Sequence, residues 1–259
     1  MQLKQLELIG EGTLTVYLRD SCQRMPRVID RPLVLVVPGG GYNHVSPREG
    51  DPVALQFAAA GYHTAVLDYA VGEKAKEWLP LRQLAQAIGL VREHAAAWHV
   101  LPEKIAVCGF SAGGHLALSG AVLDLPGKTA QPRPNAVIVG YPVITAGEFA
   151  HRSSFEQLAG SANPAAQKKF SLEDKITPGT PPVFVWHTME DKTVPVENTL
   201  MLLSALRRAG VPCEAHLFEK GVHGTSISTA EVDQPSRHRN RWVELAVEWL
   251  TDTFDYSVY

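Results

Sequence analysis

Polar and apolar residues alternate with a period of two at the start of the chain. The alternation runs over Leu3–Ile9 and Thr13–Arg19, and the triplet Gly10-Glu11-Gly12 separates the two runs. Such alternation is typical of a half-buried strand, and a short glycine-containing link between two such runs favours a tight turn. The N-terminal residues therefore predict an antiparallel β-hairpin.

Further along, apolar runs without a polar face alternate with segments of helical periodicity. The run Leu33–Val37 (LVLVV) is apolar on both sides, and such a strand belongs in a sheet covered on both faces. Strands are predicted at Leu33–Val37, His63–Leu67, Lys104–Cys108, Ala136–Val139, Val183–Trp186 and Cys213–Phe218. Helices are predicted at about Pro52–Ala60, Leu81–Trp98, Ala112–Leu123, Val196–Ala209 and Ser236–Thr251. This order implies βαβ crossovers, so we predict an α/β fold with a mostly parallel central sheet, helices on both faces and the hairpin at its antiparallel edge.

One long segment, residues 142–182, does not follow the alternation. It is rich in Pro, Gly, Ser and Ala, with short helical signals at Ser154–Leu158 and Pro164–Phe170. A loop this long in a compact domain is usually functional. Because 259 residues suit one α/β domain, we expect a single domain over residues 1–259, with a small insertion at about 142–182 over the C-terminal edge of the sheet.

The composition and net charge of the chain argue against nucleic acid and membranes as partners. A formal net charge of −3 gives no electrostatic footprint for nucleic acid or an anionic membrane. No apolar run approaches the roughly 18 residues that a membrane span needs, and the N-terminus has no apolar signal-peptide core. A homodimer stays open, because homodimers are the commonest assembly and no exposed apolar stripe demands one.

The cysteines indicate the redox environment. The chain has three, Cys22, Cys108 and Cys213, without metal-binding or redox spacing, and an odd count argues against a disulfide framework. We interpret Cys108 and Cys213 as small buried residues, which suits a reducing cytoplasm. The sequence therefore predicts a cytoplasmic protein.

The stretch Gly109-Phe110-Ser111-Ala112-Gly113 is the candidate for the central chemistry. It matches G-x-S-x-G, in which a strained strand-to-helix turn exposes a nucleophilic serine. The pattern alone is weakly specific, but here it follows a β-branched strand and opens an apolar helix, as the motif requires. The hydroxyl would project at a helix N-terminus, where the dipole favours developing negative charge.

A serine nucleophile needs a base and an orienting acid, which we expect on loops after later strands. Asp191 follows the strand predicted at Val183–Trp186, and His223 follows the strand predicted at Cys213–Phe218. The two residues follow Ser111 in the order Ser, Asp, His, which is expected for such partners in an open α/β sheet. Glu190 is the competing acid, and we prefer Asp191 because its shorter side chain suits a tight turn.

Donors for the oxyanion of a tetrahedral intermediate are the third requirement. The backbone N–H of Ala112, directly after the nucleophile, is the first candidate. The second is expected in the loop Pro38-Gly39-Gly40-Gly41-Tyr42, where uncovered glycine N–H groups can approach a ligand closely. Gly40 and Gly41 both qualify, and the sequence does not choose between them.

These motifs resemble the α/β-hydrolase fold, specifically its esterase/lipase branch near bacterial acetyl xylan esterases. The resemblance covers nearly the whole chain from Leu33 and rests on PGGGY, GFSAGGHLA, PPVFVWHTMEDKTVPVENT and GVHG. Lipase-like relatives begin the glycine loop with histidine, whereas Pro38 stands here, as in the sugar-esterase relatives. The resemblance implies Ser111, Asp191 and His223 as the triad and a hydrolase without a cofactor.

Several other residues are assigned from the residue pattern. His94 and His99 lack the i, i+4 spacing of a helical zinc pair, so no metal site is predicted. Tyr42 and His44 follow the glycine loop and are expected to line the acyl or alcohol pocket. His115 is expected to be packed in the fold and His187 to brace the acid loop, whereas Trp78 is interpreted as a loop anchor in preference to a sugar-stacking platform.

The resulting hypothesis is a serine hydrolase of short acyl esters, with acetyl esters of sugars or oligosaccharides as the expected small-molecule substrates. One alternative is an amidase or peptidase, such as an arylformamidase-like hydrolase, because the same triad cleaves amides. Another is a binding module on the same scaffold, because fold does not fix function. Such modules typically lack a triad member, and all three residues are present here.

Overall fold

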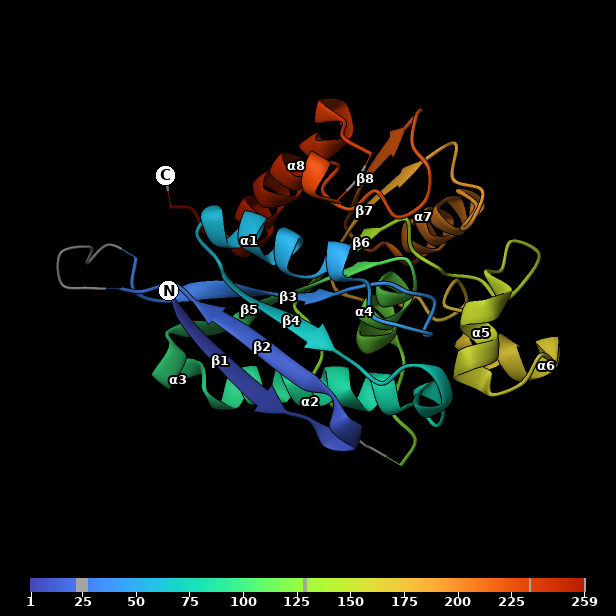
Figure 1. Ribbon diagram of the computed structural model, residues 1–259, viewed down its shortest axis with the longest axis horizontal. Helices are drawn as coiled ribbons and strands as arrows, with labels where there is room; N and C mark the ends of the chain where they lie inside the picture. Colours follow the sequence, from blue (N-terminus) through green and yellow to red (C-terminus); the bar gives the residue numbers. More distant parts are fainter. Residues whose placement is uncertain (22–27, 128–129, 233, 259) are drawn as a thin grey trace.

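Eight strands form one sheet in the computed structural model, which describes residues 1–21, 28–127, 130–232 and 234–258 (Figure 1). The strands are β1 (Gln2–Glu7), β2 (Thr13–Leu18), β3 (Arg31–Val37), β4 (His63–Asp68), β5 (Val100–Phe110), β6 (Ala136–Gly140), β7 (Val183–Thr188) and β8 (Cys213–Phe218). Their order is β1-β2-β4-β3-β5-β6-β7-β8. The β1–β2 and β2–β4 pairs are antiparallel, and all other pairs are parallel. The predicted mostly parallel sheet with an antiparallel hairpin at its edge is confirmed.

Helices cover both faces of this sheet. They are α1 (Asp51–Ala59), α2 (Leu79–Glu93), α3 (Ala95–Trp98), α4 (Ala112–Val122), α5 (Arg152–Ala159), α6 (Pro164–Gln167), α7 (Glu197–Ala209) and α8 (Arg237–Phe254). The short 3₁₀ turns are η1 (Ile9–Glu11), η2 (Pro47–Glu49), η3 (Gly72–Ala75), η4 (Lys168–Phe170) and η5 (Ala230–Val232). The apolar residues of α1 and α8 pack on one face, and those of α2, α4 and α7 pack on the other.

Strand β3 shows why the central strands are apolar on both sides. Leu33, Leu35 and Val37 point into the core beneath α2 and α4, whereas Val34 and Val36 point toward α1 and α8. All five are fully buried. Because successive side chains of a strand face opposite sides, only an uninterrupted apolar run fills both cores.

Some boundaries and burial predictions differ from the structure. The helix expected to reach Trp98 is divided at His94, whose backbone (φ −91°, ψ 3°) ends α2 before α3 begins. Cys108 is buried as predicted, but Cys213 is only half-buried because β8 is the last strand of the sheet. Cys22 lies outside the described residues. Among the helices of the described ranges, none is long and apolar enough to cross a bilayer.

The insertion at residues 142–182 contains α5, α6 and η4, which lie together at one end of the sheet in Figure 1. Asn198 on α7 fixes its first residues, because its Oδ1 accepts from the backbone N–H groups of Ile144 (2.9 Å) and Thr145 (3.1 Å). The Asn198 side-chain amide also donates to the carbonyl of Phe149 at 2.9 Å. The insertion is thus attached by side-chain bonds from an element distant in sequence.

Candidate active site

Ser111 occupies a strained turn between β5 and α4. Its φ of 52° and ψ of −119° lie outside the regions that non-glycine residues ordinarily adopt. Neighbouring glycines make room for the turn, because a Cβ on Gly109 would lie 2.2 Å from the carbonyl oxygen of Gly113. A Cβ on Gly113 would lie 2.1 Å from that of Val37. The turn therefore sets the serine hydroxyl at the N-terminus of α4.

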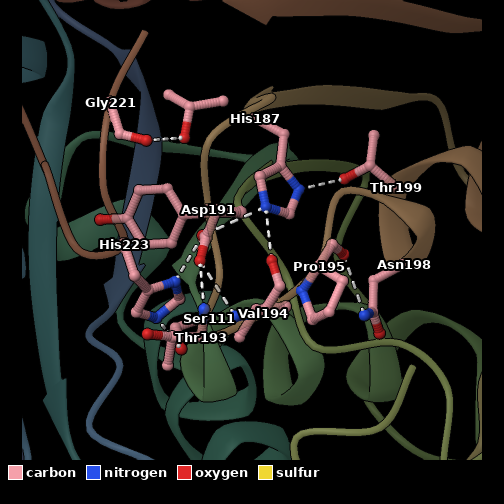
Figure 2. Close-up of polar contacts among 12 residues, drawn as sticks. Ser111, His187, Asp191, Thr193, Val194, Pro195, Asn198, Thr199, Gly221 and His223 are labelled. Carbon is pink, nitrogen blue, oxygen red and sulfur yellow. Dashed lines mark hydrogen bonds and ion pairs between the residues drawn. The ribbon is translucent and has the colours of Figure 1, made fainter. Parts of the chain in front are cut away.

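The three residues predicted to form a triad are joined by hydrogen bonds (Figure 2). The hydroxyl of Ser111 lies 2.8 Å from Nε2 of His223, and Nδ1 of His223 lies 2.6 Å from Oδ2 of Asp191. Asp191 follows β7 and His223 follows β8, so adjacent parallel strands deliver them to the same edge as Ser111. The arrangement holds the His223 proton on Nδ1 and leaves Nε2 free to accept from the serine.

Asp191 is kept ionised by the groups around it. Its side chain is fully buried, and burial alone would raise its pKa. Hydrogen bonds from His187 and His223 outweigh burial and hold the pKa below its ordinary value. The N–H groups of Thr193 and Val194 also donate to Oδ1, at 2.9 and 3.0 Å.

His187 braces the acid loop, as the sequence suggested. Its Nε2 lies 3.2 Å from Oδ2 of Asp191 and 3.0 Å from the carbonyl oxygen of Val194. Both partners are acceptors, so Nε2 carries the proton and Nδ1 accepts from the hydroxyl of Thr199 at 2.7 Å. The competing acid Glu190 instead bonds Lys220 and the N–H of Gly221, away from His223.

The glycine loop presents uncovered N–H groups. The carbonyl of Gly39 accepts from Ser46, and that of Gly40 accepts from Asn43 and His44. In a planar trans peptide the C=O and N–H groups point in opposite directions. The N–H groups of Gly40 and Gly41 therefore point away from the residues that bond the carbonyls of Gly39 and Gly40. Within the described ranges, neither has a hydrogen-bond acceptor, and the N–H of Ala112 has none either.

A cavity of about 370 Å³ adjoins these groups. Every side chain that lines it is polar, and the other lining residues are glycines: Gly40, Gly41, Asn43, His44, Ser46, Arg48, Glu49, Ser111, His151, Ser153, Gln157, Thr193, His223 and Gly224. The cavity therefore offers several hydrogen-bonding side chains beside Ser111.

The structure places His44 at this cavity but corrects the expectation for Tyr42. The side chain of Tyr42 is 1% exposed and turns into the core beneath the glycine loop. There its hydroxyl donates to Nδ1 of His115 at 2.8 Å. Nε2 of His115 donates to the carbonyl of Phe170 at 2.8 Å, so this histidine is packed in the fold as predicted. Burial lowers the pKa of His115 to about 4 and keeps it neutral.

Sequence reasoning missed the residues that the insertion contributes. His151, the N-cap residue of α5, lines the cavity together with Ser153 and Gln157 on that helix, and Nδ1 of His151 lies 2.8 Å from the hydroxyl of Ser154. The length of the insertion was the only signal for them, because no motif marks the individual positions. Trp78 packs against Phe170 at 4.8 Å between ring centroids, which agrees with its interpretation as an anchor.

Among the described residues, no three histidine, cysteine or carboxylate side chains are grouped to hold a metal ion. The arrangement provides a serine hydroxyl, a base that accepts its proton, an ionised carboxylate behind that base and free N–H donors beside the serine. Together these groups can carry acyl transfer.

Comparisons with known proteins show the family to which this chain belongs. The family model described as BD-FAE matches residues 23–206. Endo-1,4-beta-xylanase B of Butyrivibrio fibrisolvens is 36% identical over 215 residues, which are 78% of this chain and 34% of that protein. An acetylxylan esterase of Xylanibacter ruminicola is 30% identical over 203 residues, covering 76% of this chain and 41% of that protein.

Among solved structures, a carboxylesterase of Lactobacillus plantarum superimposes with a TM-score of 0.88 at 30% identity and covers 100% of both chains. The chain spans only 34% and 41% of the two curated relatives above, but the whole of this structural neighbour. The similarity therefore extends over the entire fold.

Proposed function

This chain belongs to the BD-FAE family of α/β-hydrolases, and from that premise we propose that it is a serine carboxylesterase. The observation that carries the proposal is the continuous chain of hydrogen bonds from Ser111 through His223 to Asp191. Its serine end adjoins the N–H groups of Gly40, Gly41 and Ala112, which have no acceptor among the described residues. The names of the relatives, which include an acetylxylan esterase and a carboxylesterase, support the same reaction class.

In the proposed reaction, His223 takes the proton of Ser111 as Oγ bonds to the acyl carbon. The resulting oxyanion accepts from the N–H of Ala112 and from Gly40 or Gly41. The ester C–O bond then breaks, and His223 gives its proton to the departing alcohol. A water molecule repeats the sequence, which releases the acid and restores the Ser111 hydroxyl, while Asp191 stabilises the imidazolium in both halves.

We further propose that the substrates are short acyl esters of sugars or oligosaccharides, with acetyl as the acyl group. The polar side chains that line the cavity support a hydroxyl-rich alcohol, and a volume of about 370 Å³ supports a short acyl group. Two relatives carry names that refer to xylan or its acetyl esters. A panel of acetylated xylo-oligosaccharides, longer acyl esters and aryl formamides tests this, and preferred turnover of the formamides would contradict it.

The proposed reaction is tested by Ser111→Ala and Asp191→Asn, assayed with p-nitrophenyl acetate. Loss of the nucleophile is expected to lower kcat by at least about 10⁴-fold, and loss of the acid charge by about 10⁴-fold. Glu190→Gln is the matched control and is expected to retain activity, because its carboxylate bonds Lys220 and Gly221 instead of His223. Wild-type turnover in Ser111→Ala would overturn the mechanism.

A further inference from the structure

Glu49 is a buried carboxylate in the cavity wall that the proposed reaction does not use. It lies at the end of η2 and is 3% exposed. Its Oε2 accepts from the N–H of Gly39 at 2.7 Å, and its Oε1 accepts from the hydroxyl of Tyr141 at 2.6 Å. Within the described ranges no cationic side chain forms an ion pair with it. A buried carboxylate without a cation is costly, so its place requires these hydrogen bonds.

Tyr141 connects Glu49 to the loop that carries His223. It follows β6 directly, and its hydroxyl oxygen accepts from the N–H of Ser226 at 3.0 Å while donating to Glu49. Its ring packs edge-on against the imidazole of His223, with 5.0 Å between centroids. Burial, reinforced by the charge of Glu49, raises the pKa of Tyr141 well above its ordinary value and keeps the hydroxyl a donor.

Glu49 accepts a hydrogen bond from the peptide unit that directly precedes the unpaired N–H groups of Gly40 and Gly41. Pro38 and Gly39 share one peptide, whose carbonyl accepts from the hydroxyl of Tyr69 at 2.7 Å and whose N–H donates to Glu49. With both ends of that peptide fixed, the next two peptides are oriented by the bonds to the carbonyls of Gly39 and Gly40. The direction of the Gly40 and Gly41 N–H groups therefore depends on an anchor that Glu49 provides.

We propose that Glu49 and Tyr141 are positioning residues, an inference that rests on the proposed ester hydrolysis. They hold the oxyanion-binding glycine loop and the histidine loop in a fixed relation, so that donors and base face the same reacting carbon. Neither residue gives or takes a proton in the reaction. Their effect lies in the transition state, where a displacement of about 1 Å can cost about 10²-fold in rate.

The test compares Glu49→Ala, Glu49→Gln and Tyr141→Phe with wild type, using p-nitrophenyl acetate. We expect Glu49→Ala to lower kcat by about 10- to 100-fold while KM changes by less than about 3-fold. Glu49→Gln is expected to retain an intermediate kcat, because its amide oxygen still accepts from Gly39. Tyr141→Phe keeps the ring against His223 but loses both hydrogen bonds, and is expected to lose about 10-fold in kcat.

Covalent inactivation by a fluorophosphonate is a second measurement, which probes the same oxyanion donors without catalytic turnover. The rate of covalent inactivation by a fluorophosphonate is expected to fall in each variant in proportion to kcat/KM, because its phosphoryl oxygen binds where the oxyanion does. Glu173→Ala is the matched control. Glu173 is a half-buried carboxylate that accepts from Thr145 at 2.7 Å and does not line the cavity, so its loss should leave kcat unchanged.

The outcomes separate the possibilities. If Glu49→Ala keeps the kcat of Glu173→Ala, or if Glu49→Gln loses as much as Glu49→Ala, the positioning role is wrong; the second result would indicate an effect of charge. If Glu49→Ala does not fold, the kcat values of Glu49→Gln and Tyr141→Phe are compared with that of Glu173→Ala instead. A wild-type kcat in both variants would overturn the proposal. Failure of the proposed function itself would appear separately, as a wild-type protein that neither cleaves esters nor is labelled at Ser111.

Discussion

Two regions meet at the cavity, the serine turn and the insertion at residues 142–182, and they are built by different physical means. The turn is fixed locally, because glycines at 109 and 113 allow backbone contacts that any Cβ would prevent. The insertion is fixed at a distance, by bonds such as those from Asn198 on α7. The turn supplies the hydroxyl of the proposed nucleophile, whereas the insertion supplies the part of the cavity wall that contains His151, Ser153 and Gln157.

The difference suggests a division of labour. A rigid turn that cannot relax is suited to groups that must stay aligned in the transition state, and changes there should appear in kcat. A wall attached by a few side-chain bonds is suited to contacts with the bound substrate, and changes there should appear in KM. Three substitutions test this division, one in each region and one at their junction.

The largest effect is expected from Gly113→Ala in the turn. The new Cβ would lie 2.1 Å from the carbonyl oxygen of Val37 and 2.3 Å from that of Pro38, and backbone atoms cannot move aside cheaply. We expect a loss of about 3 kcal/mol or more in the free energy of unfolding, measured by urea denaturation, together with a lower kcat, because β3 leads into the glycine loop.

The control for this change is Gly89→Ala in the middle of α2. There a Cβ would meet only Pro132 Cγ at an ordinary 3.4 Å. Because alanine favours a helix interior over glycine by about 0.5–1 kcal/mol, this variant should be as stable as wild type or more so. Equal stability of the two alanine variants would contradict the steric account of the turn.

The next effect is expected at His115, which joins the two regions. It lies on α4, one turn after Ser111, and donates to the carbonyl of Phe170 in the insertion. Its folded-state pKa of about 4 is below the unfolded value of 6.5, so the unfolded chain takes up a proton first as the pH falls. Stability from this residue is therefore complete above about pH 6.5 and is lost between that pH and about 4.

Between pH 7 and pH 5 this loss should amount to about 2 kcal/mol in the free energy of unfolding. Urea denaturation at both pH values, with wild type and His115→Gln, measures it. His63, whose pKa burial also lowers to about 4, contributes in the same window in both proteins, so the difference between them isolates His115. An identical pH dependence in the two proteins would show that His115 is not held neutral at the junction.

The same contrast explains what the sequence can predict. LVLVV and the other apolar runs determine their strands because both faces must be buried, and Gly109, Ser111 and Gly113 identify the turn because the sterics are local. His223 and Asp191 were predictable because parallel strands end at one edge. The buried position of Tyr42 and the hydrogen bond between Tyr141 and Glu49 were not predictable, because each depends on a partner distant in sequence, such as His115 for Tyr42.

The smallest effect is expected from His151→Ala in the insertion. His151 lines the cavity, and burial, followed by the nearby His223, lowers its pKa, so it is neutral at pH 7 and offers hydrogen bonds without a charge. Losing one hydrogen bond to a bound substrate should raise KM by about 3- to 10-fold with kcat nearly unchanged. His216→Ala, on β8 and outside this cavity, is the matched control. Steady-state kinetics with an acetylated xylo-oligosaccharide measures both constants. A fall in kcat at constant KM would contradict the division, because it would place the insertion among the groups that act only in the transition state.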